Sequence, residues 1–348
     1  HIHDRRQRQM CIRDRTDSLQ RLDSCIKELV SDRIGVFTIP GTSSSIDILL
    51  DEKTEVNDLR PYIDTIRRVK SASEIQYMQE AASIASSAHE KAMRNSRPGM
   101  GEWEIQAMVE GHFMSSQSQW SFPSIVGGGD NATVLHYKDN NQVIGSGDLV
   151  LVDAGCEVSG YASDITRTWP VNGRFSQPQR EIYNLVLKAE LAGIEACQPG
   201  MPWVSMHEAV CVTIAEGLIE LGVLNCTLED ALGRVAGKPG VFEGQIRNFF
   251  MHGTGHFLGL DVHDVGGGRQ GDPNSSFLLE PGMVLTIEPG LYFGSWRNDI
   301  LIPERYAGIG IRIEDDVLVT EQGPVVLSAS CPKTLDEIEQ VVGKGKHD

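Results

Sequence analysis

The chain has 348 residues, and its 48 Asp and Glu against 31 Lys and Arg give a formal net charge of −17. So large an acidic excess argues against nucleic acid or an anionic membrane surface as the main partner. Seven scattered cysteines without a CxxC pair argue against a disulfide framework or a thiolate zinc site, and they favour a reducing compartment, the cytoplasm or the mitochondrion. No apolar run reaches the roughly 18–20 residues that cross a bilayer, so we expect a soluble protein.

The first 60 residues predict little independent structure. Residues 1–15 are rich in Arg and polar side chains and have no period that would bury a face, so we interpret them as disordered or foreign to the fold. Residues 16–60 combine one helical pattern with two short apolar runs, which is too little for an α/β domain of its own. We interpret them as the remnant of a larger N-terminal domain, followed by one large domain over residues 61–342.

Helical and strand-like patterns follow one another in this large domain. Apolar residues at three-to-four spacing predict two helices between residues 63 and 113, with a break at the Pro and Gly residues of RPGMGEWE. Residues 177–222 predict two more helices. The β-like runs DLVLVDAG and YASDITRTWPV precede them, and MVLTIEPGLYF and GIGIRIEDDVLVT follow. The predicted fold class is α+β, with acidic residues placed in the strands.

An acidic residue interrupts the first of these strands. Asp153 follows the apolar residues 149–152, where an unpaired carboxylate is costly to bury. If the chain folds back with Val158 and Ser159 at the tip of a hairpin, Asp153 lies opposite Asp164. Two opposed carboxylates repel each other, so this arrangement requires a cation between them or a proton on one of them.

The second strand pair repeats the pattern with Glu288 in LTIEPG and Glu314 in RIEDD, and His256 lies in the glycine-rich MHGTGHFLG. Each of these residues, taken singly, is more often exposed or salt-bridged than a ligand. Together, one imidazole and four carboxylates are a hard ligand set that suits Mn²⁺, with Co²⁺, Zn²⁺ or Fe²⁺ as alternatives. Shared carboxylates favour two ions about 3.5–4 Å apart that hold a bridging hydroxide as the nucleophile.

The ordered segments VLHY, LVDAG with SDITRT, HGTGHFLGLDVHD, TIEPG and RIEDD resemble the motif set of the pita-bread metallopeptidases, in the branch of Xaa-Pro aminopeptidases and proline dipeptidases. The resemblance runs from about residue 60 to about residue 341. It implies a pita-bread (creatinase/aminopeptidase) fold with a truncated N-terminal domain, in which residues 61–342 form the catalytic domain. It also implies five metal ligands, namely Asp153, Asp164, His256, Glu288 and Glu314.

The same resemblance implies roles for residues around the ions. His136, His263 and Arg312 match catalytic positions, and His252 with His263 matches positions that contact substrate. Neighbouring acids such as Asp315 and Asp316 are expected at the surface or behind the ligands.

The implied reaction is hydrolysis of the N-terminal Xaa-Pro bond of peptides that carry proline at the second position, by a homo-oligomer such as a dimer or tetramer. The compact link IPERYAGIGIRIEDD favours an aminopeptidase. A proline dipeptidase is the main alternative, because it would share the ligands and the reaction. Methionine aminopeptidase and a metal-free binding module of the same fold are further alternatives.

Overall fold

The computed structural model describes residues 21–30, 35–42, 47–48, 50, 55–265 and 277–345. The chain divides into two compact units, residues 1–65 and residues 66–348. In the first unit, helix α2 (Leu22–Val30) precedes two parallel strands, β1 (Gly35–Thr38) and β2 (Glu55–Asp58). Helix α4 (Arg60–Arg68) contains the boundary between the two units. The helical pattern expected in this region is confirmed by α2, whereas the proposed lead-in of residues 1–15 lies outside the described residues.

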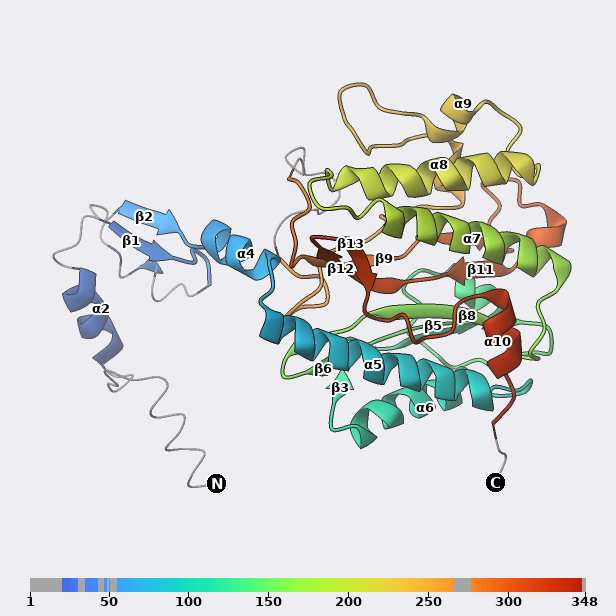
Figure 1. Ribbon diagram of the computed structural model, residues 1–348, viewed down its shortest axis with the longest axis horizontal. Helices are drawn as coiled ribbons and strands as arrows, with labels where there is room; N and C mark the ends of the chain where they lie inside the picture. Colours follow the sequence, from blue (N-terminus) through green and yellow to red (C-terminus); the bar gives the residue numbers. More distant parts are fainter. Residues whose placement is uncertain are drawn as a thin grey trace. The chain divides into compact units, whose positions relative to one another are not determined.

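Two helix pairs enclose the strands of the second unit. The first pair is α5 (Ala72–Asn95) and α6 (Glu102–Ser115), and the second is α7 (Gln177–Glu195) and α8 (Val204–Glu220). Figure 1 shows one pair on each side of the strands. Helix α5 begins at a capping box, in which Ser71 and Glu74 satisfy each other's backbone N–H groups. The two helices over residues 177–222 and the break at RPGMGEWE are confirmed, but residues 63–113 hold the end of α4 as well as α5 and α6, where two helices were predicted.

The strands between the helices form small antiparallel sheets. One sheet has the order β4 (Ile125–Gly128), β5 (Leu149–Ala154), β8 (Ile165–Pro170), and a second has the order β3 (Gln119–Trp120), β6 (Cys156–Val158), β7 (Tyr161–Ala162). A third has the order β13 (Gly323–Val326), β12 (Asp315–Thr320), β9 (Val284–Ile287), and β10 (Gly290–Phe293) pairs with β11 (Ile309–Arg312). All four predicted β-like runs contain strands, but each of the last three is divided into two strands by a short break.

The predicted register of the first hairpin is wrong by two residues. Val158 pairs with Tyr161, and Asp153 lies opposite Thr166 instead of Asp164. The reason is the turn, which consists of Ser159 and Gly160, both with positive φ, as a two-residue hairpin turn favours. A shift of two residues keeps every side chain on its face of the sheet, so the first two acids still share one face.

Short elements complete the second unit, and the sequence patterns did not predict them: η2 (Gly129–Thr133), α9 (Leu228–Leu232), η3 (Gln245–Asn248), η4 (Glu304–Tyr306) and α10 (Leu335–Val341). The main core lies between the helices and the sheets, where Ala85, Val152, Ile182 and Ile311 are fully buried. Within the described ranges, no helix is long and apolar enough to cross a membrane.

Candidate metal centre

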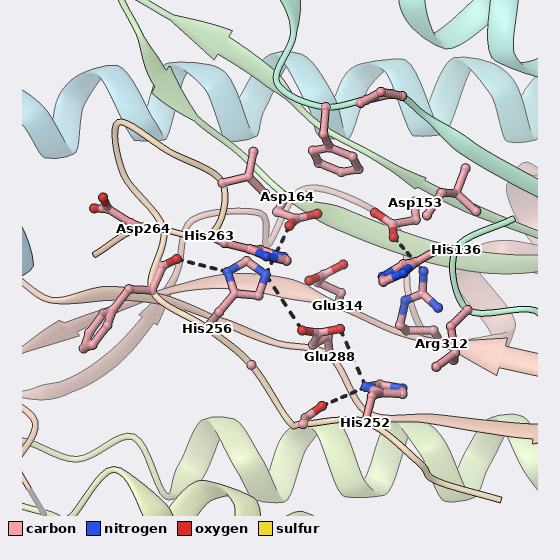
Figure 2. A pocket seen from close by; sticks show the side chains of 18 of the residues that line it. His136, Asp153, Asp164, His252, His256, His263, Asp264, Glu288, Arg312 and Glu314 are labelled. Atoms are coloured by element: carbon pink, nitrogen blue, oxygen red, sulfur yellow. Dashed lines mark hydrogen bonds and ion pairs between the residues drawn. The ribbon is translucent and has the colours of Figure 1, made fainter. Parts of the chain in front are cut away.

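The acidic residues that were predicted to lie in strands are mostly at strand breaks. Asp153 belongs to β5, but Asp164 lies between β7 and β8, Glu288 between β9 and β10, and Glu314 between β11 and β12. The four carboxylates nevertheless face one common pocket (Figure 2).

His256 reaches the same pocket because the glycine-rich segment passes close to β9. The backbone N–H of Thr286 donates to the His256 carbonyl at 2.9 Å, and Glu288 N donates to the Thr254 carbonyl at 2.7 Å. A Cβ atom at Gly255 would collide with the Thr286 carbonyl oxygen, so a residue with a side chain could not allow this approach. Gly255 therefore lets the backbone of this segment pack against β9, which places His256 beside the carboxylates.

All nine residues predicted for the site line one pocket of about 660 Å³: His136, Asp153, Asp164, His252, His256, His263, Glu288, Arg312 and Glu314. Apolar side chains share its wall, among them Phe122, Ile125, Leu135 and Val262. A polar floor beside an apolar wall is typical of a small-ligand site.

Three of the five predicted ligands form a tight group. Asp164, His256 and Glu314 can each offer one ligand atom so that the three atoms lie within 4.8 Å of one another. His256 Nε2 is 3.4 Å from Asp164 Oδ2 and 3.8 Å from Glu288 Oε1. The other ring nitrogen of His256, Nδ1, lies 3.0 Å from the Phe257 carbonyl oxygen, which leaves Nε2 directed at the acids.

The fourth carboxylate has a cationic partner. Arg312 Nη2 donates to Asp153 Oδ2 at 2.6 Å, and Arg312 is itself almost fully buried. Burial by itself lowers the pKa of Arg312, but the neighbouring Tyr292 and Asp153 outweigh it and hold the pKa well above its ordinary value. Asp153 therefore lines the pocket without joining the group of three.

The other three carboxylates, Asp164, Glu288 and Glu314, lie close together, and none of them forms an ion pair with Lys or Arg among the described residues. Burial and the Glu314 carboxylate raise the pKa of Asp164 well above its usual range, and burial with Glu288 does the same for Glu314. Burial raises the pKa of Glu288 to about 8. Burial and the adjacent His263 lower the pKa of His256 to about 4, so its imidazole is neutral near pH 7.

This donor set fits divalent metal ions. Asp153 Oδ1 and Asp164 Oδ1 are buried atoms without a hydrogen-bond partner among the described residues, in a pocket of crowded carboxylates. Such oxygens are costly to bury unless a cation or a donor reaches them. Carboxylate oxygens with one neutral imidazole are ligands that Mn²⁺, Co²⁺, Fe²⁺ and Zn²⁺ accept.

Two residues that the sequence patterns did not single out link the ligands to the rest of the site. Thr166 Oγ1 donates to Glu314 Oε2 at 2.5 Å, and the Tyr292 hydroxyl lies 2.8 Å from His252 Nε2 and 3.0 Å from Arg312 Nη1. A signal for Thr166 was present, because period-two alternation places it on the face of Asp164. Tyr292 could have been suspected from its place four residues after Glu288.

The two predicted catalytic histidines are exposed in the pocket. The rings of His263 and His256 lie 4.2 Å apart between centroids. The residue after His263, Asp264, forms ion pairs with Lys70 and Arg67 at 3.1 and 2.6 Å, and these pairs tie the His263 segment to the end of α4 and to the residues just before α5.

A second group of buried charges lies next to the pocket. Arg167 Nη2 donates to Asp315 Oδ1 at 2.6 Å, and Lys333 Nζ donates to Asp315 Oδ2 at 2.5 Å and to Glu190 Oε1 at 2.8 Å. Asp316 is also buried and accepts the backbone N–H of Asp164 at 3.1 Å. Asp315 and Asp316 were predicted to lie either at the surface or behind the ligands. The surface alternative is wrong, because both residues are buried behind the residues that line the pocket.

Comparison with known proteins gives a consistent set of matches. Residues 76–321 match metallopeptidase family M24. The chain is 41% identical over 330 residues to the Xaa-Pro aminopeptidase of Haemophilus influenzae, covering 93% of this chain and 73% of that protein. It is 43% identical over 286 residues to the Xaa-Pro aminopeptidase of Escherichia coli, covering 82% of this chain and 62% of that protein. The solved structure of zinc-substituted E. coli aminopeptidase P in complex with product matches with a TM-score of 0.85 and 38% identity, over 94% of this chain and 75% of that one.

Proposed function

The chain belongs to metallopeptidase family M24, and on that premise we propose that it hydrolyses the N-terminal Xaa-Pro bond of peptides with a pair of divalent metal ions. The family resemblance and the α+β pita-bread fold, both predicted from the sequence, are confirmed. Because the chain spans 73% and 62% of the lengths of the two aminopeptidases, their activity comes to it as a proposal.

One observation carries the proposal: four carboxylates and one neutral imidazole line a single pocket, and two of the buried carboxylate oxygens have no hydrogen-bond partner among the described residues. We assign Asp153 to one ion, His256 and Glu288 to the other, and Asp164 and Glu314 to both. When bound, the ions would supply an activated water and a polarised scissile carbonyl.

The protein's own side chains would orient the substrate and carry protons. We assign His136 and His263 to the carbonyl oxygen and the departing nitrogen, because both rings line the pocket and are exposed. Arg312 holds Asp153 in place through its 2.6 Å ion pair. Residues 61–342 would then be the catalytic domain.

Specificity for proline follows from what an Xaa-Pro bond lacks. The bond has no amide N–H, so a site that demanded this donor would exclude it. We place the proline ring against His252 and His263. His252 suits this role because burial lowers its pKa to about 3, which keeps the ring neutral, and because its Nε2 is held by the Tyr292 hydroxyl at 2.8 Å.

We further propose Mn²⁺ as the metal, since all the ligands except His256 are carboxylates. Co²⁺ and Zn²⁺ are the alternatives, and the E. coli structure compared above is a zinc-substituted form. We also propose that the protein forms a homo-oligomer, either a dimer or a tetramer. We propose a cytoplasmic location because the cysteine usage of the sequence favours a reducing compartment.

The test is to compare three substrates in parallel, Xaa-Pro-Yaa, Xaa-Ala-Yaa and the dipeptide Xaa-Pro, with Mn²⁺ or Co²⁺ present. We expect kcat/KM for the alanine tripeptide to be about tenfold to a hundredfold lower than for the proline tripeptide, or roughly 1.4–2.7 kcal/mol of transition-state binding. Equal cleavage of the two tripeptides would overturn the specificity. Cleavage of the dipeptide alone would assign the chain to the proline dipeptidases.

A further inference from the structure

Glu102 is a fully buried acid at the first position of helix α6, outside the pocket. Its carboxylate accepts four hydrogen bonds. Oε1 accepts from Gly128 N at 2.7 Å and Asn131 Nδ2 at 2.9 Å, and Oε2 accepts from the Tyr137 hydroxyl and Gln142 N, both at 2.9 Å. No Lys, Arg or His pairs with it among the residues that the structure describes. A buried carboxylate without a cation is costly, and these donors are what stabilises it.

All four donors come from one segment, residues 128–142, which we call the His136 loop. Two of the donors precede His136 in the chain and two follow it, so a single carboxylate ties the two ends of the loop together. Gln142 is held twice, because its carbonyl also accepts the backbone N–H of Glu102 at 2.9 Å. Tyr137, which directly follows His136, is bonded through its hydroxyl.

Helix α6 holds the loop at a second point on the same face. Gln106, one turn after Glu102, accepts a hydrogen bond at 2.9 Å from the side chain of Asn140. The same amide group of Asn140 donates to the Ser124 carbonyl, and its Oδ1 accepts from Val126 N at 3.0 Å. Asn140 is buried in the left-handed region with φ of 44°, which fixes the return of the loop to the helix.

We propose that Glu102 is a positioning residue that fixes His136 in the pocket, an inference that rests on the proposed function of that site. His136 is exposed, and no hydrogen bond of its own side chain fixes it among the described residues, so its place depends on the backbone of its loop. The carboxylate is specifically required, since Gly128 N, Asn131 Nδ2 and Gln142 N can only donate. A Gln at position 102 would point its NH₂ group at one pair of donors.

The decisive experiment is a double-mutant cycle with Glu102→Gln and His136→Ala on a Xaa-Pro-Yaa tripeptide, with Mn²⁺ bound. We expect Glu102→Gln to lower kcat/KM about tenfold to a hundredfold, as a misplaced catalytic group does, without loss of metal. In the His136→Ala background the same change should cost less than about threefold, because the residue that it positions is gone. Equal factors in both backgrounds would overturn the proposal.

Two further variants distinguish the loss of a positioned His136 from a simple folding defect. Tyr137→Phe removes one hydroxyl from the network and should lower kcat/KM severalfold, again only when His136 is present. Glu104→Gln on the same helix turn is the matched control with unchanged activity, because the Gln side-chain carbonyl can replace the carboxylate in accepting the Gly101 backbone N–H.

Hydrogen exchange supplies a readout that does not need catalysis. In Glu102→Gln, residues 128–142 should exchange faster than in the wild type while helix α5 keeps its protection, and unchanged exchange of the loop would overturn the proposal. Failure of the wild type to cleave any proline peptide would instead refute the proposed function, and loop exchange would still decide the role of Glu102.

Discussion

Glu314 and Asp315 are neighbours in the chain, but their carboxylates belong to two buried groups with different ratios of acidic to basic residues. Asp315 lies with Glu190 against Arg167 and Lys333, so two carboxylates face two cations. We call these four residues the balanced cluster. Burial by itself raises the pKa of Asp315, but Arg167 and Lys333 outweigh it and hold the pKa well below its ordinary value.

Glu314 faces the pocket together with Asp153, Asp164 and Glu288, and we call these four carboxylates the acidic cluster. Arg312 is the buried cation that pairs with one of them, Asp153. Here burial and neighbouring carboxylates raise the pKa of Glu314 well above its usual range, the reverse of the shift at Asp315. Within the balanced cluster only Asp315, which has both cations as partners, shows the lowered pKa, whereas burial and Asp315 raise the pKa of Glu190. The comparison of Asp315 with Glu314 teaches that two adjacent cations can outweigh burial, and that a buried carboxylate surrounded by other carboxylates requires an added cation or a proton.

The largest expected effect comes from changing the acidic cluster at Glu314. Glu314→Gln should remove at least one metal ion per chain and lower kcat/KM about a thousandfold or more, or at least about 4 kcal/mol of transition-state stabilisation, because the proposed function assigns Glu314 to both ions. Metal analysis with steady-state kinetics checks this. A variant that keeps both ions and near-normal turnover would contradict the assignment.

The neighbouring change is the matched control. Asp315→Asn should retain metal in the folded protein but lower the free energy of unfolding by about 3–5 kcal/mol, because it leaves Arg167 and Lys333 without their shared partner. Denaturant unfolding of the metal-free protein measures this separately from metal binding. If Asp315→Asn instead released the metal without loss of stability, the division into two clusters would be wrong.

His263→Ala should affect the reaction and not the ions. We expect full metal content and a kcat lower by roughly two to four orders of magnitude, the range for losing one acid–base or oxyanion group. Loss of metal on this substitution would show that His263 is a ligand, and the ligand set would need revision.

The pH dependence of stability should differ between the metal-free and the metal-loaded protein. A carboxyl group whose folded pKa is raised binds protons more tightly in the folded state, so its contribution to stability is lost as pH rises. For Glu288 this stability is lost between pH 4.5, its ordinary pKa, and about pH 8, its pKa in the folded protein. The free energy of unfolding then falls by up to about 1.4 kcal/mol per pH unit. Asp164 and Glu314 shift in the same direction.

Denaturant unfolding between pH 7 and pH 8, with chelator or with Mn²⁺, measures this difference above the range in which the buried histidines affect stability, because their pKa values are lowered from 6.5. The chelated protein should lose more stability than the loaded protein as pH rises, since the ions replace the protons on Glu288, Asp164 and Glu314. Glu190 and Asp316, whose pKa values burial also raises, contribute equally to both curves. Asp315 does not interfere, because its lowered pKa acts below its ordinary value of 3.8. Parallel curves with and without metal would contradict the interpretation of the acidic cluster.

The smallest effect is expected at Thr166. Thr166→Val keeps the shape of the side chain but removes the 2.5 Å hydrogen bond to Glu314 and the long, 3.3 Å hydrogen bond that Thr166 Oγ1 accepts from Arg312 Nε. We expect kcat/KM to fall threefold to tenfold, in line with about 0.5–1.5 kcal/mol for a hydrogen bond. Thr168→Val is the control, because its hydroxyl bonds to the Arg312 backbone carbonyl and to no ligand. An equal effect of the two substitutions would mean that the bond to Glu314 has no special role.

Local patterns predicted the long helices, most of the strands and the acidic cluster, because strand alternation, glycine-rich turns and motif order are all encoded within short segments. The five short helical elements of the second unit were missed. The hairpin register was missed because it depends on which two residues form the turn. The balanced cluster was missed for another reason. Arg167 and Asp315 are 148 residues apart, and nothing local to Asp315 indicates the cation that it meets.

The central claim is that the acidic cluster acts through two metal ions. We would remove metal with a chelator, then titrate Mn²⁺ into the metal-free protein and follow hydrolysis of a Xaa-Pro-Yaa tripeptide against ions bound per chain. The account predicts no activity without metal and a rise that ends at two ions per chain. Full activity in the metal-free protein, or saturation at one ion, would contradict it.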